Sequence, residues 1–193
     1  MIFPPRASFL GALCLCASSS ATAPREQASV RCAIYEAAIH AVNDSERLVV
    51  IDSTSDGVPM FAFMAVSGSP HTPAQQGLPL SDSLLQALHS ANQSRESLTP
   101  CLVALRDVQP VSDDSLIALF GRDAKGWTRF RARYSGIRRF VLLSRPLMLS
   151  DSAALVYTAS ASDWLAGEGV VLRLERDSGG HWGRKASAVL WIS

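Results

Sequence analysis

Apolar residues recur at helical spacing in four stretches of the first two thirds of the chain. Between residues 29 and 43 they fall three to four positions apart, which predicts an amphipathic helix. A second helix is predicted after Ser81, because a serine hydroxyl is a good N-cap for the leucine-rich run that follows. Two further helices are predicted at 112–120 and 123–134. The last of these carries three aromatic residues on one face: Trp127, Phe130 and Tyr134.

The last third of the chain changes to runs of strand length that are rich in Val, Leu, Tyr and Trp. These runs lie at 138–144, 153–161, 169–176 and 182–192. Turn-forming residues separate them, so they predict an antiparallel meander with helices packed on one face. Short strands are also predicted at 48–51 and 102–105. We therefore expect an α+β fold in which N-terminal helices and a short strand pack on a C-terminal four-stranded antiparallel meander.

The domain organisation predicted for the 193 residues is a signal segment at 1–21 and a single α+β domain at 22–193. Within that domain, residues 55–80 hold four prolines and three glycines that interrupt any regular pattern. This irregular segment is longer than an ordinary connection, which indicates that it is either functional or flexible.

The N-terminus has the three parts of a secretory signal peptide. Arg6 supplies a positive charge, residues 8–17 form an apolar run too short to span a bilayer, and small residues precede a cleavage site after Ala21. Cys14 and Cys16 do not fit a lipid-attachment site, because each follows a leucine where a small residue is needed. We expect a periplasmic or secreted protein without a transmembrane span in the mature chain, and favour ordinary cleavage over lipid anchoring.

Composition narrows the function classes. Hydrophobic residues make up 48% of the chain and charged residues 18%, which excludes a disordered chain. The net charge is only +1. Because nucleic-acid binding needs many phosphate contacts, we do not expect a nucleic-acid partner.

Two cysteines, Cys32 and Cys101, remain after the signal segment. In an oxidising compartment such a pair can form a disulfide. The alternative is two buried free thiols, because cysteine also packs as a small apolar residue. The sequence leaves both interpretations open.

A local basic run contains Arg129, Arg131, Arg133, Arg138 and Arg139. Helical spacing places Arg129 and Arg133 on one face, with Arg131 elsewhere. A solvated face is the ordinary interpretation of such a run, and a binding surface for an anion or an acidic partner is the alternative. Arg129 and Arg133 are therefore candidate binding residues.

A second candidate is the stretch from Asp163 to Gly169, where Gly167 and Gly169 flank Glu168. Paired glycines in a connection between strands predict a positive φ or a β-bulge, and Trp164 could line a small cleft there. A tight turn with a packed tryptophan is the simpler interpretation. Trp164 and Glu168 are the candidate binding residues of this segment.

One pair of residues has a spacing that could bind a metal ion. Glu36 and His40 stand four residues apart on the first predicted helix, a spacing that can hold a metal or form an exposed polar stripe. A third ligand is not apparent, so we predict no metal site, no cofactor and no catalytic residue.

The order of aromatic, glycine and strand residues resembles a group of small exported bacterial proteins of unassigned function. The resemblance covers residues 115–193. Its motifs are Trp127-x-x-Phe130, Tyr134-x-Gly136, Ala154-Leu-Val-Tyr157, Gly167-x-Gly169, Gly180-x-Trp182 and Trp191-Ile-Ser193. It implies an exported protein and supports the predicted fold, but it carries over no catalytic residue. Many members of the group have cysteines beside the glycine-rich connection, whereas residues 160–166 contain none here.

These observations favour a non-enzymatic exported module that binds a protein or a small ligand in the bacterial envelope. One alternative is a periplasmic hydrolase with a site near Trp164 and Glu168. That alternative requires Glu168 to lie in a concave, partly apolar pocket. Another is an inhibitor or immunity-type protein that uses the segment at 55–80 as its contact surface.

Overall fold

The computed structural model describes residues 23–42, 47–56, 75–120 and 125–193. The predicted signal segment and most of the irregular segment at 55–80 lie outside these ranges. The helices are α1 (Ala23–Val42), α3 (Asp82–Ala91), α4 (Thr99–Leu102), α5 (Asp113–Phe120) and α6 (Gly126–Arg133). The strands are β1 (Leu48–Ile51), β2 (Gln75–Gln76), β3 (Val108–Val111), β4 (Phe140–Leu143), β5 (Leu147–Ser150), β6 (Ala153–Asp163), β7 (Ala166–Arg176) and β8 (Trp182–Ile192).

The strands form one mixed sheet in the order β2-β8-β7-β6-β4-β1-β3, with β5 paired to β6 beside this path. The predicted α+β class is therefore confirmed. The four predicted C-terminal runs do pair antiparallel, as β4-β6-β7-β8. The short strand at 48–51 does not pack on this meander as predicted. It extends the sheet as β1, which is parallel to both β3 and β4.

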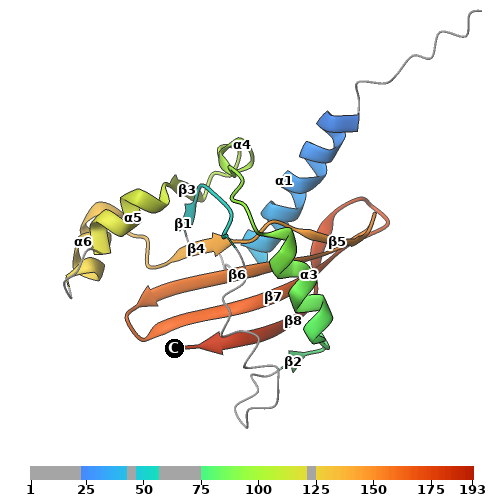
Figure 1. Ribbon diagram of the computed structural model, residues 1–193. Helices are drawn as coiled ribbons and strands as arrows, with labels where there is room; N and C mark the ends of the chain where they lie inside the picture. Colours follow the sequence, from blue (N-terminus) through green and yellow to red (C-terminus); the bar gives the residue numbers. More distant parts are fainter. Residues whose placement is uncertain (1–22, 43–46, 57–74, 121–124) are drawn as a thin grey trace, which may run out of the picture.

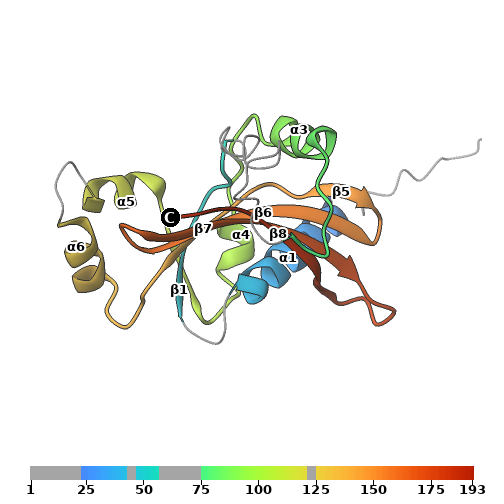
Figure 2. The same ribbon diagram turned by 90° about the horizontal axis from the view of Figure 1, so that it is seen from below.

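The helices cover both faces of the sheet, not the single face that was predicted (Figures 1 and 2). Helix α1 packs on one face through Ile34 and Ala38, against residues such as Val156 and Leu172. Helix α3 covers the opposite face, where its leucines meet Tyr157. Helices α5 and α6 lie at one end of the molecule, over β1 and β4. Strand β1 is buried along its whole length because it has helices on both sides.

Most local predictions agree with the structure. Helix α3 begins after Ser81, whose Oγ accepts a hydrogen bond from the backbone N–H of Leu84 at 3.3 Å. The strand predicted at 102–105 is wrong. Residues Thr99–Leu102 form the short helix α4 with Pro100 in its first turn, a position where proline needs no hydrogen-bond partner. The next strand, β3, starts only at Val108.

Candidate functional site

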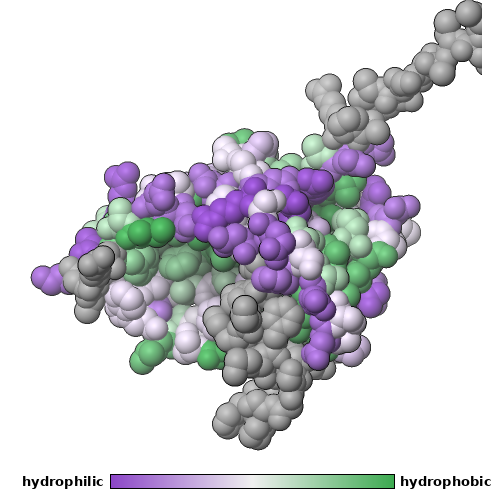
Figure 3. Space-filling model, in the orientation of Figure 1, coloured by the Kyte–Doolittle hydropathy of each residue, from purple (hydrophilic) through white to green (hydrophobic). Residues whose placement is uncertain are grey.

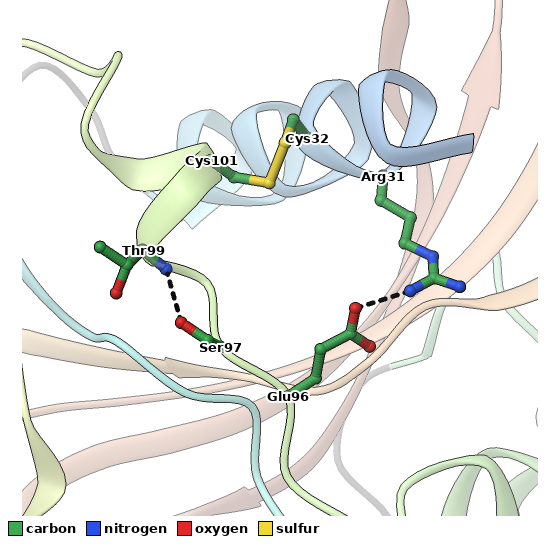
Figure 4. Close-up of a disulfide and its surroundings, with 6 residues drawn as sticks. All are labelled: Arg31, Cys32, Glu96, Ser97, Thr99 and Cys101. Atoms are coloured by element: carbon green, nitrogen blue, oxygen red, sulfur yellow. Dashed lines mark hydrogen bonds and ion pairs between the residues drawn. A yellow bond between two sulfur atoms is a disulfide. The ribbon is translucent and has the colours of Figure 1, made fainter. Parts of the chain in front are cut away.

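Cys32 on α1 and Cys101 on α4 are joined by a disulfide, with their Cα atoms 4.9 Å apart (Figure 4). The bridge links the helix on one face of the sheet to the chain that leads into β3. The sequence left open whether these cysteines form a disulfide or two buried free thiols, and the structure has the disulfide. It therefore ties two elements together that are far apart in sequence.

Three charged residues near this bridge form a linked set. Arg31 contacts Glu96 at 2.6 Å, and the other carboxylate oxygen of Glu96 lies 2.9 Å from Nε of Arg145. The set connects α1, the chain before α4 and the chain after β4; Figure 4 shows the Arg31–Glu96 contact. Tyr35 lies beside it, and burial, assisted by the negative charge of Glu96, raises the pKa of the Tyr35 hydroxyl. These ion pairs link α1 to the chain before α4 and to the chain after β4, next to the buried side chain of Tyr35.

Trp164 lies in the two-residue turn between β6 and β7, with Leu165 as its neighbour. The backbone N–H of Trp164 donates to Oδ1 of Asp163 at 2.8 Å. Its indole packs edge-on against Phe120 at the end of α5, with ring centroids 5.8 Å apart. The turn is thus seated beside α5, while about half of the Trp164 surface stays exposed (52%).

Gly167 and Gly169 lie inside strand β7, not in the connection where they were predicted. Neither has a positive φ; in the part of the chain that the structure describes, only Gly77, Gly136 and Gly180 do. The alternative prediction of a bulge agrees better, because the β7–β8 register shifts after Gly169. A Cβ atom at Gly169 would collide with the indole of Trp191.

Glu168 lies on β7 opposite Ser160 of β6. It lines a shallow hollow of about 260 Å³ together with Ser160 and Arg139. Side chains alternate along a strand, so Glu168 is on the same face as Val170, which belongs to the α1 core. The structure therefore does not bring Trp164 and Glu168 into one pocket: Trp164 packs on Phe120, and Glu168 belongs to a different hollow.

The two predicted arginines have different environments. The guanidinium group of Arg129 donates hydrogen bonds to the backbone carbonyls of Leu119 and Phe120, at 2.5 and 3.1 Å, and so caps the C-terminal end of α5. Arg133 is exposed on α6. Arg129 is consequently a structural residue, and only Arg133 stays available on the surface.

Sequence reasoning missed the arginine that joins the two candidate segments, Arg131. Its Nη2 atom contacts Oδ2 of Asp163 at 2.8 Å, and its guanidinium lies 5.9 Å from the centre of the Trp127 ring. The backbone N–H of Trp164 and then Arg131 lower the pKa of the Asp163 carboxyl. No local signal could have revealed this pair, because its members are 32 residues apart in sequence.

Around this pair lies a surface that we call the basic end surface, formed by Arg131, Arg138, Arg139, Trp164, Leu165 and Ile192. Arg131 and Arg138 line a hollow of about 610 Å³ between α6 and the β6–β7 turn. Arg139 lines the adjoining hollow with Glu168, and the two hollows share Ser162 and Ala166. Leu165 and Ile192 stand beside them with 84% and 72% of their surfaces exposed. Figure 3 shows apolar surface at this end of the molecule, on the left.

A separate groove of about 580 Å³ runs between α1 and the β7–β8 turn. It is lined by Glu36 and His40, and also by His181 from the turn. Nε2 of His40 lies 3.8 Å from Oε1 of Glu36, which matches the polar stripe expected on the helix. Across the ranges that the structure describes, no three His, Cys, Asp or Glu side chains are placed to hold a metal ion.

Among the helices that the structure describes, none is both long and apolar enough to cross a membrane.

The chain matches no protein-family model, and neither a curated protein nor a solved structure is significantly similar to it.

Proposed function

We propose that this chain is an exported, non-enzymatic module of the bacterial envelope, and that it binds its partner through the basic end surface. The observation that carries the proposal is the juxtaposition of Arg131 and Arg138 with the exposed side chains of Leu165 and Ile192. Exposed apolar residues set among arginines are typical of binding surfaces, because arginine and aromatic residues are enriched there.

Export is the second part of the proposal. Its support is the signal-like N-terminus together with the Cys32–Cys101 bridge, since disulfides persist in oxidising compartments. Intact-mass measurement on protein recovered from the periplasm of expressing bacteria tests this part. We expect a chain that begins at Thr22, and a secreted chain that retains Met1 would contradict the proposal.

Affinity capture from bacterial envelope extract tests the binding surface. The test variant combines Leu165→Ser with Arg138→Glu. The matched control combines Val103→Ser with Lys185→Glu, which makes the same kinds of change at exposed positions away from the surface. The proposal expects a component that the wild type and the control retain and the test variant loses. Equal capture by all three proteins would overturn it, and so would no capture by any of them together with no binding to lipid vesicles.

A further inference from the structure

The occupant of the basic end surface can be inferred from its shape and charge, and this inference rests on the function proposed above. We infer that the surface docks on an anionic lipid bilayer. The side chains of Trp164, Leu165 and Ile192 enter the interfacial region, and the arginines contact lipid phosphates.

The apolar residues are placed to enter a bilayer. Trp164 and Leu165 form the tip of the β6–β7 hairpin, and Leu165 is 84% exposed. Ile192 lies near the end of the neighbouring strand β8, on the hollow that also holds Ala166 of the hairpin. Figures 1 and 2 both place the hairpin tip, the end of β8 and α6 at the same end of the molecule. Tryptophan and leucine are side chains that membrane-surface proteins bury at the headgroup boundary.

The charges around the tip suit an anionic surface. Residues 125–140 contain six basic side chains and no acidic one. Three of the six line the two hollows, namely Arg131, Arg138 and Arg139, and the acidic residues that line the same hollows are Asp163 and Glu168. The net charge of the whole chain is +1, so the remainder of the chain is net negative. This asymmetry would turn the basic end toward an anionic membrane and the remainder away from it.

Two arginines lie beside the base of the tip. Arg131 is tied to Asp163, the residue that precedes the tip, so it marks the base of the turn. Arg138 lines the same hollow, and Ser162 adds a hydroxyl-bearing side chain there. Within the described ranges, Arg138 forms no ion pair. Its guanidinium group can therefore meet a phosphate without losing an ion-pair partner among the described residues.

A protruding tip favours a bilayer over an acidic protein. Protein interfaces concentrate their binding energy in residues that fill well-packed, fully desolvated pockets. Here Leu165, the most exposed of the large apolar side chains that the structure describes, stands on a two-residue turn and lines neither hollow, an arrangement that a fluid interface accommodates without a matching pocket.

Vesicle flotation with the full chain, purified after export, tests the inference. The vesicles are phosphatidylcholine mixed with phosphatidylglycerol, and pure phosphatidylcholine is the neutral comparison. We expect binding to the anionic vesicles that weakens with added salt, because exposed charges are screened. Leu165→Ser with Ile192→Ser should reduce the partition coefficient by about tenfold or more, since each loses an inserted apolar side chain. Arg138→Glu should also reduce it, whereas Val103→Ser with Lys185→Glu should leave it unchanged.

Unchanged melting temperatures for the variants would show that they fold, as expected for substitutions at exposed positions. Equal flotation on anionic and neutral vesicles, or flotation that survives Leu165→Ser with Ile192→Ser, would overturn the inference. If the anionic vesicles are not bound, but a protein captured from envelope extract is lost with the variant that combines Leu165→Ser with Arg138→Glu, the partner is a protein. In that case the lipid inference fails and the proposed function stands; when both experiments are negative, both fail.

Discussion

Arg131 and Asp163 join helix α6 to the β6–β7 hairpin by an ion pair of 2.8 Å between Nη2 and Oδ2. The pair holds the tip of the hairpin beside the arginine-rich segment, although both side chains are about half exposed. Asp163 also accepts the backbone N–H of Trp164, so one carboxylate fixes the turn and its neighbour helix.

Replacing Arg131 with Ala should raise the pKa of Asp163 only part of the way to its ordinary value. The larger cause of the lowered pKa is the backbone N–H of Trp164, which the substitution leaves in place. A pH titration of the carboxyl group by NMR measures this directly. Asp177 is the internal control, because the backbone N–H of His181 is the largest cause of its lowered pKa and Arg131 is not among its causes.

The sign of the pH dependence follows from the lowered pKa in the folded state. The contribution of Asp163 to stability is present above the pKa of the unfolded state and is lost as the pH falls through the lowered folded value. If Arg131→Ala left the pKa of Asp163 unchanged, the ion pair would not form in solution. If it moved the pKa of Asp177 equally, the effect would not be local.

Gly169→Ala should destabilise the fold by about 1–3 kcal/mol, the usual cost of forcing extra volume into a packed site. The added methyl group would collide with the indole of Trp191, whose Nε1–H donates to the hydroxyl of Tyr157 at 3.0 Å. Tyr157 is fully buried, and burial raises the pKa of its hydroxyl to about 12. The surroundings of the indole therefore have little freedom to move. Urea denaturation measures the loss.

Gly183→Ala is the matched control for this prediction. Gly183 also lies in a strand of the sheet, but nothing stands within 4 Å of the position that its Cβ would take. We expect a change within about 0.5 kcal/mol, as for other exposed substitutions. Equal losses for the two variants would mean that the Trp191 contact is not the reason for the glycine.

The sequence pattern predicted the elements whose signals are local, such as an N-cap residue or an uninterrupted apolar run. Helix α3 was predicted from Ser81 and the leucines that follow, and the buried strand β1 from four consecutive apolar residues. The parallel neighbour β3 was missed because it has four residues, one of which is Pro110. Proline normally argues against a central strand, and here β3 is the edge of the sheet. The end of helix α4 was misread because residues 102–105 are four consecutive apolar residues, a run that a short strand and the end of a helix can both contain.

The sequence predicted only part of the candidate site, and not its arrangement. Trp164 and the arginine run were each singled out from composition, whereas their proximity depends on how α6 packs at the end of the sheet. That packing is made by Trp127 and Phe130 against Phe140, contacts that no local pattern specifies. The same limit explains why Glu168 was grouped with Trp164: neighbours in a strand hairpin can belong to different faces.

Removing the disulfide by Cys32→Ser with Cys101→Ser should lower the free energy of unfolding by about 4 kcal/mol, according to the chain-entropy model for a loop of this length. The two cysteines are 69 residues apart in sequence, so the bridge restricts a large part of the unfolded chain. Guanidinium denaturation with and without a reducing agent measures the effect. The reducing agent should destabilise the wild type and leave the double variant unchanged. Two free thiols in the denatured, unreduced wild type would contradict the bridge.

Asn92→Ala should be among the more damaging single substitutions in the α3 region, because the buried side chain of Asn92 joins two elements. Its Nδ2 atom donates to the carbonyls of Leu88 and Arg145 at 2.8 and 3.2 Å, and its Oδ1 atom accepts the backbone N–H of Arg145 at 2.5 Å. Alanine would leave these backbone groups without their hydrogen-bond partner, the side-chain amide of Asn92, and should lower the free energy of unfolding by about 2–4 kcal/mol. The neighbouring Gln93→Ala is the control, since Gln93 is exposed and its side chain makes a long hydrogen bond of 3.4 Å to the backbone carbonyl of His89. We expect Gln93→Ala to change the midpoint of urea unfolding little. Comparable losses for both variants would show that the end of α3, not the link to Arg145, determines the stability of this region.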